Sequence, residues 1–135
     1  MPYIKIDRRM ALAAGAEPEC AGELNYVLTC ILLADQVNRG LGNLDIVKRI
    51  AAYQRTKGVC YQTFNDILGA LEGCRFEFKR RLSLSEDDQR LTHLSRTAAI
   101  FYGEVVAKYE DKKCAENGDV FGPYLEKRRI FKDQQ

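Results

Sequence analysis

Apolar residues recur at three- and four-residue steps through most of this chain, the spacing that forms one buried face of a helix. Four long stretches show this pattern, at residues 21–39, 43–57, 63–82 and 85–114. A shorter segment at 7–16 is expected to be a short helix or an irregular arm, because Gly15, Pro18 and Gly22 interrupt it. No stretch alternates apolar and polar residues convincingly enough to predict a strand. The fold class is therefore predicted to be all-α, a small antiparallel helical bundle of four or five helices.

The helix at 21–39 is expected to be the most buried, with Gly40 as its C-terminal stop. Its apolar residues are Leu24, Val27, Leu28, Ile31, Leu32 and Val37. The next helix has a thinner stripe and is expected to be more exposed, with Asn43 as its cap and an end before Gly58. Its stripe consists of Ile46, Val47, Ile50 and Tyr53.

Two pairs of polar residues resemble capping boxes at the starts of the last two long helices. Thr63 is followed three residues later by Asp66, and Ser85 is followed by Asp88. The stripes that follow hold a helical period for several turns. They consist of Phe64, Ile67, Leu68, Leu71, Cys74, Phe78 and Leu82 in the first helix, and of Leu91, Leu94, Ala98, Phe101, Val105 and Tyr109 in the second.

Gly69 and Gly73 share one face of the helix at 63–82. Each costs about 1 kcal/mol relative to alanine inside a helix, so a close approach is expected at that face. A tight helix crossing, within the fold or between subunits, is the favoured explanation, and the approach of a ligand to the backbone is the alternative. Together with the strongly apolar helix at 21–39, the glycines favour a homo-oligomer.

The chain has 135 residues, 46% of them hydrophobic and 30% charged, which is typical of one globular domain. We expect a single helical domain at 1–122 and a C-terminal arm at 123–135. No segment has the pattern of a membrane span or a secretory signal, so a cytoplasmic location is expected, in a host or bacterial cytosol. The formal charge of +2 predicts no general attraction to nucleic acid or membranes.

The sequence lacks the residue patterns that several kinds of functional site require. The five cysteines are scattered, without a Cys-x-x-Cys pair, and are expected to be reduced and to act as small apolar residues in helix faces. The single histidine, His93, is expected at the surface, and no base stands ready to activate a nucleophile. Glycine-rich phosphate loops are absent, and the acidic run at 86–88 is explained as the first turn of a helix. No enzyme, metal site or cofactor is therefore expected.

Two groups of residues are candidate ligand-binding sites. In the first, Arg75 and Lys79 lie four residues apart on one helix face with Arg80 beside them, and such cations could hold a phosphate-bearing ligand. The alternative is a solvated C-terminal turn whose cations favour the helix dipole.

The second group is unusually polar for a helix end and could form a pocket rim; its members are Tyr109, Lys112, Lys113 and Asn117. The alternative is a helix terminus tied to neighbouring residues by weak ion pairs. A basic tail at 127–129 could dock an anionic partner, but three cations are too few for strong duplex binding, so nucleic acid is a minor option.

Three blocks of this sequence resemble a family of small uncharacterised proteins from bacteria and their phages. They are Gly22-Glu23-Leu24-Asn25-Tyr26, the segment Tyr61-Gln62-Thr63-Phe64-Asn65-Asp66-Ile67-Leu68-Gly69-Ala70-Leu71-Glu72, and Tyr109-Glu110-Asp111-Lys112-Lys113 with Glu116-Asn117-Gly118-Asp119-Val120. The resemblance supplies no known activity. It implies an accessory role in a phage or prophage, exercised by binding.

Two functions remain open at this point. The first is a non-enzymatic protein that binds a small anionic ligand such as a nucleotide, with sequestration against host defence as one use. The second is a protein-interaction module that inhibits or adapts a host protein through a helix face or the basic tail. An unrecognised nucleotide hydrolase is a third, weaker option, because the acids it needs do not cluster.

Overall fold

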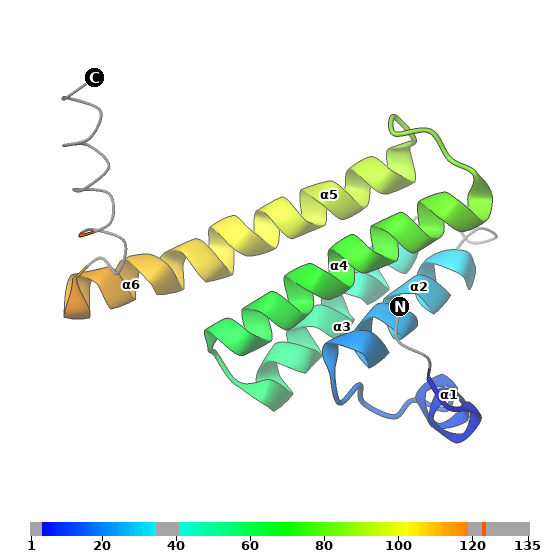
Figure 1. Cartoon of the computed structure of the whole chain (residues 1–135), viewed down its shortest axis with the longest axis horizontal. Helices are drawn as coiled ribbons and strands as arrows, with labels where there is room; N and C mark the ends of the chain where they lie inside the picture. Colours follow the sequence, from blue (N-terminus) through cyan, green and yellow to red (C-terminus); the bar gives the residue numbers. More distant parts are fainter. Residues whose placement is uncertain (1–3, 35–40, 119–122, 124–135) are drawn as a thin grey trace. The chain divides into compact units, whose positions relative to one another are not determined.

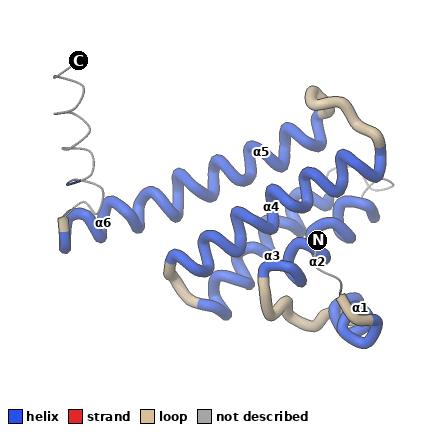
Figure 2. Tube along the Cα trace, in the orientation of Figure 1, coloured by secondary structure: helices blue, strands red, loops and turns tan. Residues whose placement is uncertain are grey.

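The computed structural model describes residues 4–34, 41–118 and 123. Every regular element within these ranges is a helix, and they contain no strand (Figure 1; Figure 2). The prediction of an all-α helical bundle is confirmed. The chain divides into two compact units, residues 1–100 and 101–135, and each is described by itself. The predicted boundary between a domain and an arm at residue 123 stays a prediction, since only Pro123 of the arm is described.

Four helices and most of a fifth form the first unit: α1 (Ile6–Ala13), α2 (Ala21–Ala34), α3 (Leu41–Lys57), α4 (Tyr61–Leu82) and α5 (Gln89–Phe101). Helices α2, α3 and α4 pack against one another, and from α2 to α5 each helix runs opposite to the one before it (Figure 1). The second unit contains a short π-helix, η1 (Tyr102–Val106), and α6 (Ala107–Asn117). Helix α6 stops before Gly118, whose φ of +83° is a left-handed value that favours glycine. None of the described helices is long and apolar enough to cross a membrane.

Helices α2 and α4 supply most of the core. The buried side chains of these two helices are Leu24, Val27, Leu28, Thr29, Leu32, Thr63, Phe64, Ile67, Ala70, Leu71, Cys74 and Phe78. Leu91 and Leu94 of α5 are buried as well. The periodic pattern therefore identified the buried faces of these helices, while Val37 and Gly40 lie outside the described residues.

Helix α3 departs from its predicted pattern at two positions. Ile46, Ile50 and Tyr53 are buried as expected, but Val47 is 52% exposed because it lies beside the buried stripe. The helix begins at Leu41, so Asn43 lies inside it and is not its cap, and that prediction was wrong. The predicted end before Gly58, where φ is +95°, is confirmed.

Both predicted capping boxes were wrong. Helix α4 begins at Tyr61 with Cys60 in the N-cap position, which places Thr63 inside the first turn, where it is 2% exposed. At α5, Asp88 is the cap: the Arg90 N–H donates to Asp88 Oδ1 at 2.9 Å, and Ser85 lies in the preceding loop. The spacing of a capping box was present in the sequence, but the helices start elsewhere.

The two glycines of α4 have different surroundings. A Cβ placed on Gly73 would lie 2.4 Å from Asn25 Nδ2 of α2, so the predicted close approach exists at this position, within one chain. A Cβ on Gly69 would meet nothing within 4 Å, so the prediction was wrong there. The predicted homo-oligomer is not needed to explain Gly73, and it stays a prediction.

The structure has no disulfide among the five cysteines, but the role predicted for them was only partly correct. Cys74 is buried in the core and acts as a small apolar residue, and burial raises the pKa of its thiol to about 12. Cys20, Cys30 and Cys60 are exposed. These three cysteines lie near helix ends or on outer faces of helices, so they do not act as buried apolar residues. Their spacing in the sequence did not reveal this exposure.

Candidate functional site

The basic residues near the end of α4 form two separate ion-pair groups. In the first, Arg75 Nη2 lies 2.7 Å from Glu86 Oε2, and Lys79 Nζ donates to Glu86 Oε1. Glu86 belongs to the loop at 83–88 that joins α4 to α5. Two cations on one face of α4 therefore hold a single carboxylate, and we call them the Arg75–Lys79 pair.

Other contacts fix the position of Arg75. Its Nε donates to Ser95 Oγ of α5 at 3.1 Å, and its Nη1 lies 3.8 Å from Glu72 Oε1. Its guanidinium carbon is 5.3 Å from the centre of the Phe76 ring. The Arg75 side chain is 17% exposed and that of Lys79 33%, whereas that of Glu86 is 56% exposed. The cations are thus the more enclosed partners and the carboxylate the more open one.

Arg80, which the sequence grouped with Arg75 and Lys79, has a different partner. Arg80 and Arg81 both donate to Glu77, with a distance of 3.0 Å from Arg81 Nε to Glu77 Oε1. The structure therefore brings Arg75 and Lys79 to one carboxylate and Arg80 to another. Hydrogen bonds from Lys79 lower the pKa of Glu86, and those from Arg80 lower the pKa of Glu77, so both carboxylates are held ionised.

The second predicted group lies in the second unit, on α6. Lys113 Nζ is 5.5 Å from the centre of the Tyr109 ring and 3.7 Å from Glu116 Oε2. Lys112 is exposed, and Asn117 is the last residue of α6. These contacts link residues within one or two turns of the same helix. This group and the residues Arg75, Lys79 and Arg80 belong to different units, and the role of the group in ligand binding stays a prediction.

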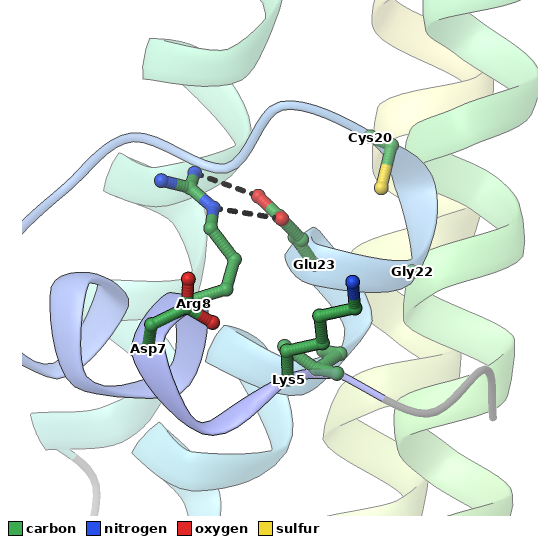
Figure 3. Close-up of a pocket in the computed structure, with 7 residues that line it drawn as sticks. Lys5, Asp7, Arg8, Cys20, Gly22 and Glu23 are labelled. Carbon is green, nitrogen blue, oxygen red and sulfur yellow. Dashed lines mark hydrogen bonds and ion pairs between the residues drawn. The ribbon is translucent and has the colours of Figure 1, made fainter.

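A pocket of about 380 Å³ lies between the start of α1 and the start of α2 (Figure 3). Its lining consists of Ile4, Lys5, Asp7, Arg8, Cys20, Gly22 and Glu23. Arg8 donates to Glu23 from both Nε and Nη2, each at 2.8 Å, and Nη2 also donates to the carbonyl of Glu17 at 2.9 Å. This bidentate pair ties α1 and the following loop to the first turn of α2.

The Arg8–Glu23 pair makes stability depend on pH. Hydrogen bonds from Arg8 hold the pKa of Glu23 below its usual range, so the stabilisation is present above the ordinary glutamate pKa and is lost as the pH falls through the lowered pKa of the folded state. We expect Glu23→Gln to lower the free energy of unfolding at neutral pH, and this difference from the wild type to shrink in acid. Urea unfolding at a series of pH values measures it.

Glu19→Gln is the matched control for that measurement. Its side chain is 74% exposed and lies 3.9 Å from Arg8 Nη2, so its removal is expected to change stability little at any pH. Equal effects of the two variants across the pH range would contradict a special role for Glu23.

A second pocket, of about 510 Å³, adjoins the first and shares Cys20 and Gly22 with it. The start of α4 and the end of α3 complete its lining, which includes Lys57, Cys60 and Thr63. Cys60 Sγ lies 3.4 Å from Thr63 Oγ1, and this contact lowers the pKa of the Cys60 thiol. The pocket therefore places an exposed thiol and a lysine at one end of the bundle.

Asp66 also lines the second pocket, and both of its carboxylate oxygens accept hydrogen bonds. The Tyr53 hydroxyl donates to Oδ2 at 2.8 Å, and Gln62 Nε2 donates to Oδ1 at 2.9 Å. Two main causes raise the pKa of the Tyr53 hydroxyl: the larger is its burial, and the smaller is this hydrogen bond to Asp66. Asp66 thus joins α3 to α4 and is not the partner of Thr63 in a capping box, as its spacing from Thr63 suggested.

Sequence reasoning missed both pockets, although one local signal was present. Glu23 is the third residue of α2, and its Oε1 accepts the N–H of Glu19 at 2.9 Å, a contact typical of a helix start. Nothing local indicated that Arg8 would be its partner. His93 is exposed, as expected, and the described residues contain no group of three His, Cys, Asp or Glu side chains that could hold a metal ion.

Comparisons with known proteins identify a family for the chain. No curated protein and no solved structure matches it. Residues 1–120 match the model of the family described as a domain of unknown function (DUF6899). This match spans nearly the whole chain, including both pockets and the ion pairs of α4. The chain therefore belongs to the DUF6899 family.

Proposed function

We propose that this protein is a non-enzymatic binding protein for a small anionic ligand, and that Arg75 and Lys79 hold the anion. The observation that supports this function is that both cations already converge on one carboxylate, that of Glu86. A pair of cations that accommodates a carboxylate is suited to a phosphate as well. The predicted role of Arg80 is weaker under this proposal, since Arg80 is bound to Glu77.

The surroundings of the Arg75–Lys79 pair favour an aromatic anion such as a nucleotide. Arg75 supplies a planar fork whose orientation is set by Ser95, and Lys79 supplies a compact charge. The Phe76 ring next to Arg75 is 56% exposed, which leaves an aromatic face on which a base can stack. No catalytic constellation is part of this proposal, and the site requires no metal or cofactor.

We further propose that the protein has an accessory role in a phage or prophage. It is supported by the resemblance of the three sequence blocks to small proteins of bacteria and phages. In such a role, the protein sequesters a nucleotide in the host cytosol, and a homo-oligomer multiplies the number of sites.

Titration calorimetry of the purified protein with a panel of nucleoside mono-, di- and triphosphates and cyclic dinucleotides tests this function. We expect Arg75→Ala and Lys79→Ala each to weaken binding of the best ligand by about tenfold or more, because each removes a charge-assisted hydrogen bond. Arg81→Ala is the matched control, since Arg81 lies on the same helix but is bound to Glu77. Its affinity is expected to stay within about twofold of the wild type. Absence of binding to the whole panel, or equal losses in all three variants, would contradict the proposal.

Protein interaction is the second candidate, and a different observation favours it. Ile6 and Met10 lie four residues apart on α1, so they share one face, and they are 64% and 67% exposed. An exposed apolar pair of this kind suits a partner helix. The basic tail at 127–129 lies outside the described residues. Under this reading, Met10→Asp abolishes capture of the partner and leaves nucleotide binding unchanged, whereas Arg75→Ala does the reverse.

A further inference from the structure

The loop that carries Glu86 is anchored at both of its ends. At the end of α4, Ser83 adopts a left-handed conformation with φ of 51°, and the Leu84 N–H donates to the Lys79 carbonyl at 3.0 Å, which closes the helix. At the start of α5, Asp88 caps the helix through the N–H of Arg90. These anchors do not involve the Glu86 side chain. The carboxylate of Glu86 can therefore leave α4 without loss of either helix end.

Glu86 is also the accessible member of its ion pairs. Its side chain is 56% exposed, while Arg75 and Lys79 are 17% and 33% exposed. A solute can therefore replace the carboxylate from the solvent side, without opening the core. Exposed ion pairs are individually weak, so an entering anion of higher charge can compete with the resident carboxylate.

The other carboxylate near Arg75 differs from Glu86 in these respects. Glu72 lies on α4 itself, its Oε1 is 3.8 Å from Arg75 Nη1, and no contact with Lys79 is found for it among the described residues. Loss of Glu72 removes the same charge from the same neighbourhood but does not vacate the position between the two cations. Substitution of Glu72 is therefore a matched control for substitution of Glu86.

We propose that Glu86 is an internal ligand, whose carboxylate occupies the Arg75–Lys79 pair until the terminal phosphate or carboxylate of a ligand replaces it and releases the loop at 83–88. This inference rests on the proposed function and adds a mechanism of control to it. The protein in its free state is self-inhibited, and the apparent affinity for the ligand is reduced by the fraction of molecules in which Glu86 is bound.

Calorimetry with inorganic pyrophosphate and ADP as probes tests whether Glu86 lowers the affinity for the ligand. We expect Glu86→Gln to bind the better probe about fivefold more tightly than the wild type, the ratio that a weak exposed ion pair supports. Glu72→Gln is expected to change affinity by less than about twofold. Glu86→Asp keeps the charge but shortens the side chain, so it is expected to tighten binding as well. Equal affinities of the Glu86→Gln and Glu72→Gln variants would overturn the inference.

Hydrogen exchange in the loop supplies a second readout, from the wild-type protein. Ligand binding ordinarily slows amide exchange around a site, but displacement of Glu86 is expected to accelerate exchange of the Asp88 N–H, which donates to the Ser85 carbonyl at 3.1 Å within the loop, on addition of the probe. Slower exchange of this amide, with binding that still depends on Arg75, would overturn the internal-ligand mechanism and leave the proposed function standing. Absence of binding by wild-type and Glu86→Gln proteins alike would overturn both.

Discussion

Replacing Phe64 by alanine is expected to lower the free energy of unfolding by about 3–5 kcal/mol, the largest effect that we predict for a single substitution. Phe64 is fully buried in α4, at the start of the helix that packs against both α2 and α3. Truncation removes a large apolar surface from the core and leaves a cavity that the surrounding helices can fill only in part. Urea unfolding followed by circular dichroism measures the change.

Phe76→Ala is the matched control for Phe64. It lies on the same helix and loses the same atoms, but it is 56% exposed, so its cost is expected to be small. If both substitutions lowered stability equally, burial of Phe64 in the first unit would not be the source of its effect.

Gly73→Ala is expected to destabilise the protein by about 1–3 kcal/mol, the usual range for overpacking. The new Cβ would lie 2.4 Å from Asn25 Nδ2 and 3.2 Å from Asn25 Cγ. The Thr29 hydroxyl lies 3.2 Å from Asn25 Oδ1 but donates over a shorter distance, 2.8 Å, to the Asn25 carbonyl, so it holds the Asn25 side chain only weakly. Relief of the clash therefore requires a rotation of the Asn25 side chain or a separation of α2 from α4, and the rotation sets the lower end of the expected range.

Gly69→Ala supplies the opposite expectation on the same helix. Its Cβ would meet nothing within 4 Å, so the substitution is expected to stabilise the protein by about 1 kcal/mol through helix propensity alone. Chemical denaturation of both variants, in parallel, measures the difference in sign. A stabilising Gly73→Ala would show that α2 and α4 are not in tight contact at Asn25.

The helices and their buried faces could be predicted from the sequence because they depend on local spacing. The stripes of α2 and α4 and the end of α3 before Gly58 follow from it. The capping boxes failed for a related reason: a suitable pair at the correct spacing is common, and competing contacts decide which residue caps. Asp66 accepts a hydrogen bond from Tyr53, thirteen positions away, instead of completing a capping box with Thr63.

The candidate site could be predicted only in part. The spacing of Arg75 and Lys79 placed them on one face, and that expectation follows from helix geometry. Their common partner could not be foreseen, since the acidic run at 86–88 was predicted to be the first turn of a helix. That prediction was wrong, because α5 begins at Gln89 and the run lies in the preceding loop. The position of the loop at 83–88 decided that Glu86 points back to α4 while Asp88 caps α5.

The sequence by itself determined the fold class and the apolar faces of α2 and α4, because period and composition are properties of short segments. It did not determine that the predicted helix at 85–114 is divided by the π-helix η1, which changes the helical period so that Val106 is buried and not Val105. The tertiary structure decided which glycine meets a neighbouring helix, which cysteine is buried and which charges are paired. Arg8 and Glu23 are 15 positions apart, Arg75 and Glu86 are 11 apart, and Arg75 and Ser95 are 20 apart. Such partners meet only after the helices have packed, so their pairing depends on the relative placement of elements and is not encoded in any local pattern.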